Sequence, residues 1–118
     1  MYPLKFEPIL KQTLWGGYKI ISFKQLNDTR TEVGESWEIS AVEGSESIVA
    51  EGPDKGMTLT EVLSKYREEL LGEANYARFG VKFPLLVKFI DARQDLSIQV
   101  HPSDELAKKR HNSMGKTE

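Results

Sequence analysis

The hydrophobic positions of residues 58–71 repeat at the spacing of an α-helix and form the clearest pattern in the chain. Thr58 and Glu61 match the capping box, in which each side chain accepts a hydrogen bond from a backbone N–H at the helix start. Gly72 stands where a glycine commonly ends a helix in a left-handed conformation. These signals predict a helix over residues 58–71 with one apolar stripe, made up of Leu59, Val62, Leu63, Tyr66 and Leu70.

Three other segments show the patterns of β-strands. Residues 36–42 alternate apolar and polar side chains, which predicts a half-buried strand. Residues 84–91 are almost continuously apolar, which is typical of a strand with both faces covered. Residues 96–101 alternate again, and we expect this strand to end at Pro102 because proline cannot donate to a sheet.

The remaining segments complete a small α+β unit. Residues 1–14 are predicted to be an extended arm or edge strand, and Gly16–Gly17 indicates a turn or a close approach of two backbones, with a short helical turn after it. The segment 47–56 suggests another short strand, followed by a tight turn at 52–54. A last helix is expected from Ser103, because acidic residues at its start and basic residues at its end suit the helix dipole. The strands are too few to close a barrel, so some edges are expected to stay open.

Composition and charge narrow the class of protein. The 118 residues suffice for a single domain, and 39% hydrophobic with 29% charged residues describe a globular protein. A net charge near −2 with interleaved signs suggests neither a nucleic-acid partner nor a membrane partner. The chain has no cysteine, which excludes disulfides and thiolate metal sites. No signal-peptide pattern or long apolar run is present, so a cytoplasmic location is expected.

The strand predicted at 96–101 carries the first candidate chemistry. Its polar face would hold Ser97, Gln99 and His101. An amide oxygen and an imidazole can both bind a divalent cation, but the same residues are common on a solvated strand face. A zinc site needs at least three protein ligands, and His111 is either a further partner or a solvated residue at a helix end.

A second candidate is Lys88, which interrupts the apolar run 84–91. A charge there is costly unless it is paired or faces a polar cavity, where it could contact a phosphate or move a proton. Alternatively, its stem lies along the sheet while the ammonium group reaches water. Glu35 and Glu38 flank Trp37 and either line a pocket or point outward.

Several short motifs, in this order, carry a resemblance to a known family. Together they strongly resemble the type I mannose-6-phosphate isomerase (phosphomannose isomerase) family, a zinc-dependent branch of the cupin jelly rolls. The motifs are "LWGG" (14–17), "GESWEIS" (34–40), "GMTLTEVL" (56–63), "LLGE" (70–73), "FPLLVKFIDA" (83–92), "LSIQVHPSDELA" (96–107) and "GKTE" (115–118). The resemblance implies the N-terminal part of an incomplete cupin-like jelly roll, mainly β with a few helices.

The resemblance also implies roles for individual residues. Zinc would be bound by Gln99, His101 and Glu118. Lys88 and Lys116 would lie at the active site, in substrate contact or proton transfer. The residues expected to bind substrate or to support the pocket are Ser97, near the phosphate, Trp15 and Glu35.

The implied reaction interconverts mannose 6-phosphate and fructose 6-phosphate. A proton moves between C2 and C1 through an enediol, so a general base is needed. Lys116 is one physically admissible base, because a nearby dication lowers the pKa of a lysine. Zinc would act as a Lewis acid on the carbonyl and hydroxyl oxygens.

The resemblance is incomplete at its C-terminal end. The chain ends on the third ligand, Glu118, and a fourth ligand, a later histidine, has no counterpart. We therefore expect residues 1–118 to be one domain, the N-terminal portion of a truncated isomerase with weak zinc binding and little activity alone. The alternative is a non-catalytic module, made of a partial cupin, that binds sugar phosphates or self-associates. Either form could dimerise through exposed strands.

Overall fold

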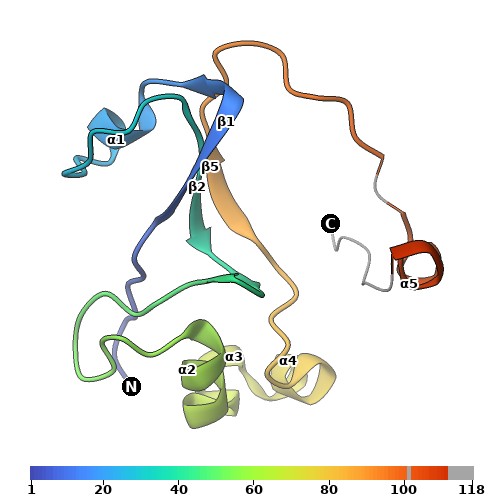
Figure 1. Cartoon of the computed structure of the whole chain (residues 1–118). Coiled ribbons are helices and arrows are strands. Elements are labelled where there is room, and N and C mark those ends of the chain that lie inside the picture. Colours follow the sequence, from blue (N-terminus) through green and yellow to red (C-terminus); the bar gives the residue numbers. More distant parts are fainter. Residues whose placement is uncertain (101, 112–118) are drawn as a thin grey trace.

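An open antiparallel sheet runs through the middle of the chain. The computed structural model describes residues 1–100 and 102–111, the last two of these without their side chains. Strands β1 (Ile9–Gly17), β2 (Val33–Ile39) and β5 (Val87–Ile90) pair in the order β1-β2-β5 (Figure 1). The predicted combination of short strands, helices and an unclosed sheet is confirmed.

The strand predicted at 36–42 is confirmed, with an interruption. It begins earlier, as β2, and continues after Ser40 as β3 (Ala41–Val42), which pairs with β4 (Ser45–Glu46) in a hairpin. Ser40 is buried, and its backbone N–H donates to the Ser47 hydroxyl at 2.8 Å. Its own hydroxyl accepts from the backbone of Val42 at 3.1 Å. These local bonds replace the sheet ladder and turn the chain.

The helix predicted at 58–71 is confirmed over its first half. Helix α2 (Leu59–Tyr66) begins with the expected capping box, in which the Glu61 N–H donates to Thr58 Oγ1 at 3.2 Å and the Thr58 N–H donates to Glu61 Oε2 at 2.8 Å. Arg67 then adopts a φ of 48°, which breaks the helix before α3 (Glu68–Leu71). Helix α4 (Glu73–Phe79) follows and was not predicted. The hydrophobic core lies under α2 and consists of Val49, Leu59, Val62 and Leu63.

A buried carboxylate joins the turn at 52–54 to the end of α2. Asp54 is almost fully buried and accepts hydrogen bonds from the Lys65 ammonium group at 2.5 Å and from the Tyr66 hydroxyl. The Lys65 hydrogen bond, with that of Tyr66, holds the pKa of Asp54 below its usual value. The Tyr2 hydroxyl accepts from the Asp54 backbone N–H at 3.0 Å, so the N-terminal arm is fastened to the same point.

The glycine pair at the end of β1 makes the predicted close approach. Gly16 and Gly17 are both buried. A Cβ on Gly16 would lie 2.4 Å from the backbone oxygen of Glu32, and one on Gly17 would lie 2.3 Å from a carboxylate oxygen of Asp91. The expected helical turn follows as α1 (Ile20–Phe23).

Strand β5 lies within the strand predicted at 84–91, but its side chains are more exposed than predicted. Val87, Phe89 and Ile90 are 46%, 48% and 53% exposed, so the prediction that both faces are covered is wrong. The physical reason is that β5 lies at the edge of the sheet and is only partly covered, by the ring of Phe23 in α1, which lies edge-on to Phe89 at 5.7 Å between ring centres.

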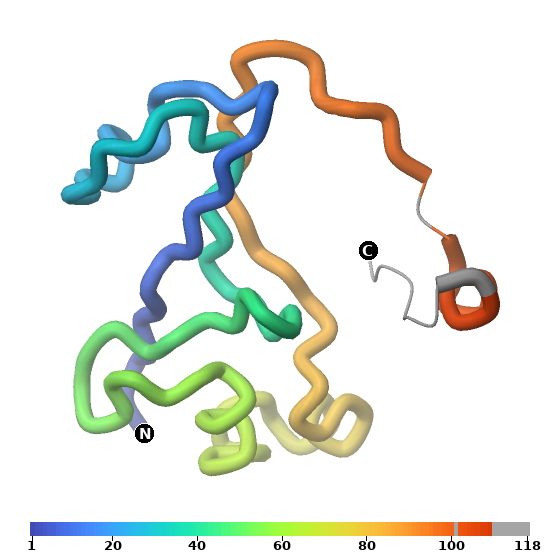
Figure 2. The backbone as a smooth tube through the Cα atoms, viewed as in Figure 1, coloured from blue at the N-terminus to red at the C-terminus, as the bar shows by residue number. Residues whose placement is uncertain are grey.

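The strand predicted at 96–101 is wrong for the residues that the structure describes. Residues 96–100 have no regular secondary structure, and Ile98 is 99% exposed. Figure 2 shows the chain leaving the sheet after β5 and running to α5 (Asp104–His111), which confirms the last predicted helix. No strand of the described part lies beside residues 96–100 to accept their backbone hydrogen bonds, so the alternating pattern alone does not produce a strand.

No helix in the described part is long and apolar enough to cross a membrane.

Candidate functional site

Lys88 and Glu35 form a half-buried ion pair between β5 and β2. The Lys88 ammonium nitrogen lies 2.5 Å and 3.2 Å from the two carboxylate oxygens of Glu35. The side chains are 28% and 13% exposed. Of the two alternatives for Lys88, the structure supports a paired charge rather than an ammonium group that only reaches water. The pairing lowers the energetic cost of placing a charge in an apolar strand, because the Glu35 carboxylate replaces part of the water that would otherwise solvate the Lys88 ammonium group.

Trp37 lies on the same face of the sheet, and charged side chains of β1, β2 and β5 lie around it. It is opposite Lys88 in the β2–β5 ladder, so the two side chains share a face. The Lys88 ammonium lies 5.9 Å from the centre of its ring, and the Lys11 ammonium of β1 lies 4.5 Å from the same centre. Lys11 also donates to the Ser45 hydroxyl at 2.6 Å. We call Lys11, Glu35, Trp37, Ser45 and Lys88 the Trp37 cluster.

Glu38, the other carboxylate beside Trp37, belongs to a separate group of contacts. It accepts from the Lys24 ammonium at 2.6 Å and from the Ser36 hydroxyl at 2.7 Å. Successive residues of a strand point to opposite faces, so Glu38 lies away from Trp37. Only Glu35 of the two carboxylates therefore joins the candidate site. The sequence analysis did not separate these two carboxylates, although strand alternation is a signal that distinguishes them.

Trp15 lies against the backbone of the central strand rather than in the Trp37 cluster. A Cβ on Gly34 would lie 2.8 Å from the Trp15 ring, so the missing side chain at Gly34 makes room for it. The Trp15 carbonyl accepts from the backbone N–H of Arg93 at 2.8 Å. In the described residues Trp15 therefore packs β1 against β2, and its predicted contact with substrate stays a prediction.

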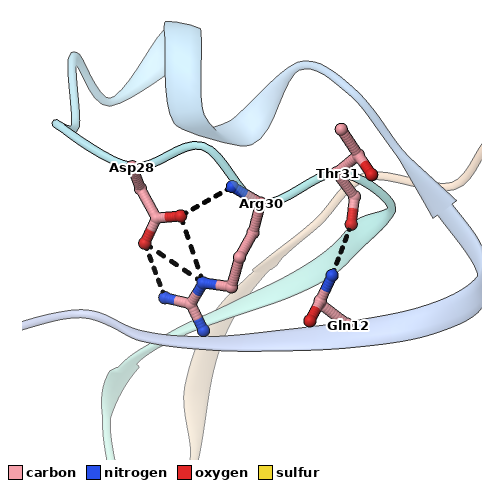
Figure 3. A network of polar contacts seen from close by, with 4 residues as sticks. All are labelled: Gln12, Asp28, Arg30 and Thr31. Atoms are coloured by element: carbon pink, nitrogen blue, oxygen red, sulfur yellow. Dashed lines mark hydrogen bonds and ion pairs between the residues drawn. The ribbon is translucent and has the colours of Figure 1, made fainter.

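A polar network at the start of β2 fixes the loop that leads into the site (Figure 3). The Asp28 carboxylate accepts from the Arg30 guanidinium, with the shortest distance 2.7 Å, and from the Arg30 backbone N–H at 2.8 Å. The Arg30 side-chain hydrogen bonds lower the pKa of Asp28 to about 2. Gln12 of β1 donates to the backbone oxygen of Thr31 at 2.8 Å, which joins the loop to the sheet (Figure 3).

The expected zinc ligands are not brought together by the residues that the structure describes. Gln99 and the nearby Ser97 are exposed, and within the described part neither side chain has a hydrogen-bond partner. His101, Lys116 and Glu118 lie outside the described residues. Among the described residues no three His, Cys, Asp or Glu side chains form a metal-binding group. Two of the three expected ligands lie outside the described residues, so the zinc site stays a prediction.

Two cavities of the described part lie away from the Trp37 cluster. One, of about 50 Å³, is lined by Gly17, Tyr18, Ile20, Ile21, Arg30, Thr31 and Val33. Another, of about 220 Å³, is lined by Lys19, Ile20, Phe23, Phe89, Ile90 and Asp91. Neither contains a residue predicted to act in catalysis or binding.

Comparison with known proteins points to one family. The family described as "Phosphomannose isomerase type I, catalytic domain" matches residues 4–117. Mannose-6-phosphate isomerase ManA of Bacillus subtilis (strain 168) is 41% identical over 117 residues, which are 98% of this chain and 35% of ManA.

Solved structures give the same result. The crystal structure of mannose 6-phosphate isomerase from Bacillus subtilis superposes with a TM-score of 0.82 at 35% identity, covering 98% of this chain and 35% of that one. A mutant phosphomannose isomerase from Salmonella typhimurium gives a TM-score of 0.69 at 28% identity, covering 90% and 27%. These likenesses confirm the predicted fold class. The chain spans about a third of the length of the Bacillus relative.

Proposed function

Because the chain belongs to the type I phosphomannose isomerase family, we propose that it supplies the N-terminal part of an enzyme that interconverts mannose 6-phosphate and fructose 6-phosphate. The observation that carries this proposal is the Lys88–Glu35 ion pair. It joins two of the sequence motifs on which the family resemblance rests, from strands 53 residues apart. Half-buried acidic and basic groups held in contact are candidates for a chemical role.

In the proposed site, Lys88 either binds a substrate oxygen through a hydrogen bond or transfers a proton to or from it. Its ammonium group donates to Glu35, and a substrate hydroxyl could accept from the same group. Isomerisation between an aldose and a ketose requires proton transfer at carbon and at oxygen, and paired acidic and basic groups serve such transfers. Lys116 remains the second proposed catalytic residue, and Ser97 and Trp15 the further proposed substrate contacts.

We propose zinc as the cofactor, held by Gln99, His101 and Glu118. The support is chemical, since an amide oxygen, an imidazole nitrogen and a carboxylate are suitable donors. When bound, zinc would supply Lewis-acid polarisation of the substrate oxygens. Glu35 and Lys88 act in this proposal through their own hydrogen bonds, independently of that ion.

A non-catalytic role is the second candidate, and the exposed apolar side chains of β5 favour it. Large exposed apolar surfaces commonly bind another polypeptide, so the chain could self-associate as a homodimer through this strand. In either case we propose that residues 1–118 act as one domain, in the cytoplasm, with a small sugar phosphate as partner. Neither a nucleic acid nor a membrane forms part of the proposal.

A chimera tests the catalytic proposal. Residues 1–118 replace the matching segment of Bacillus subtilis ManA, and formation of fructose 6-phosphate is measured. We expect an active isomerase whose activity falls by about a hundredfold or more in Lys88→Met, as for loss of a proton-transfer group. Lys82→Met, at an exposed lysine, is the matched control. A folded chimera without activity, or one unaffected by Lys88→Met, would refute the assignment.

The self-association candidate is tested separately, by analytical ultracentrifugation of the chain alone.

A further inference from the structure

The half-buried lysines of the described part differ in whether a carboxylate pairs with their ammonium group. Three lysine residues have intermediate exposure: Lys11, Lys24 and Lys88. Lys24 lies 2.6 Å from a carboxylate oxygen of Glu38, and Lys88 lies 2.5 Å from one of Glu35. Within the described residues Lys11 has no ion pair. Because a partly buried ammonium group is normally compensated by a carboxylate, Lys11 lacks the partner that the other two have.

The two contacts of the Lys11 ammonium group within the described residues are with uncharged groups. The group donates to Ser45 Oγ at 2.6 Å and lies 4.5 Å from the centre of the Trp37 ring. Glu35 is opposite Lys11 in the β1–β2 ladder, but its carboxylate is engaged by Lys88. Glu46, next to Ser45, accepts from the backbone N–H of Thr60 at 2.6 Å. The nearby carboxylates therefore have other partners.

From this geometry we propose that Lys11, Ser45 and Trp37 form a subsite for the phosphate end of a sugar phosphate. The ammonium group has three donors, of which Ser45 uses one, and the serine hydroxyl can itself donate to a phosphate oxygen. The ring of Trp37 offers an apolar face to the C–H groups of the sugar. The substrate class rests on the proposed function, whereas the anion site rests on the unpaired charge.

The position of the subsite suits the proposed reaction. Lys11 and Lys88 lie 4.5 and 5.9 Å from the centre of the Trp37 ring, so both add positive charge around the proposed subsite. Lys88 already shares its charge with a carboxylate, which leaves Lys11 as the stronger attraction for a dianion. A phosphate group has three terminal oxygens, so the contact expected for Ser97 remains compatible with this one.

The test is an NMR titration of the ¹⁵N-labelled chain with three probes: inorganic phosphate, mannose 6-phosphate and uncharged mannose. The assigned indole N–H signals of Trp15 and Trp37 are followed separately. We expect phosphate to shift Trp37 in a saturable way and to leave Trp15 unchanged. Mannose 6-phosphate should bind more tightly than phosphate, and mannose should bind far more weakly than mannose 6-phosphate.

Variants separate the subsite from general attraction to lysines. Lys11→Met should weaken phosphate binding by about tenfold or more, as expected for loss of a charged hydrogen bond. Lys11→Arg should retain most of the affinity, and Lys55→Met, at an exposed lysine, should retain all of it. Circular dichroism of each variant establishes that it is folded.

The outcomes also distinguish this inference from the proposed function. Phosphate binding through Lys11 with no added affinity for mannose 6-phosphate would support the anion site and count against the sugar-phosphate substrate. Mannose 6-phosphate binding that is equal in Lys11→Met and the unchanged chain would overturn the subsite while leaving the proposed function standing. Absence of any saturable shift with phosphate would show that Lys11 is simply solvated, and would also overturn the subsite.

Discussion

Leu63→Ala is the most direct test of where the stability of this fold originates. Leu63 is fully buried in α2 and belongs to the core with Val49, Leu59 and Val62. The change removes three carbon atoms, which corresponds to about 2.4 kcal/mol at ~0.8 kcal/mol per buried methylene. The cavity left behind raises the expected loss of unfolding free energy to roughly 2.7–5 kcal/mol. Such a loss is a large part of the ~5–15 kcal/mol typical of a domain.

Urea unfolding followed by circular dichroism measures this loss, with Leu14→Ala as the matched control. Leu14 is 86% exposed on β1, so the same chemical change should alter the unfolding free energy by no more than about 0.5 kcal/mol. Thermal unfolding should show a corresponding decrease in Tm of roughly 4 °C per kcal/mol. Equal effects at the two positions would refute the reasoning, because they would mean that the core under α2 is not the stabilising one.

Three further predictions concern local structure. Thr58→Ala should lower the unfolding free energy by about 1 kcal/mol in urea, because it removes the capping box of α2. Gly16→Ala should cost at least about 1–3 kcal/mol in the same assay, since its Cβ would meet backbone atoms rather than a movable side chain. The folded-state pKa of Asp54 is below 3.8, so its stabilising contribution is present above pH 3.8 and is lost as the pH falls through the lower value. Unfolding free energies measured from pH 5 to pH 2 should show this loss, and Asp54→Asn should remove it; an unchanged slope would contradict the assignment.

Local patterns in the sequence predicted those elements whose cause is local. The capping box of α2 lies within four consecutive residues, so it was predicted and confirmed with its reciprocal hydrogen bonds. The break at Arg67 was missed, because the apolar spacing continues through it while the backbone φ turns positive. The strand at 96–101 was predicted from alternation, but a strand also requires a neighbour, and no described strand pairs with residues 96–100.

The candidate site divides in the same way. The sequence by itself predicted part of the site: the motif order indicated the family, and the interruption of an apolar run singled out Lys88, whereas Lys11 and Ser45 were not predicted. Only the tertiary structure decided the partners, since Glu35 and Lys88 are 53 residues apart and Lys11 and Ser45 are 34 apart. Their contacts depend on strand register and on the turn at Ser40. The spacing of residues along the chain predicts neither the register nor the turn. Register is set only when distant strands pair, and a shift by one residue would move every side chain of a strand to the other face of the sheet.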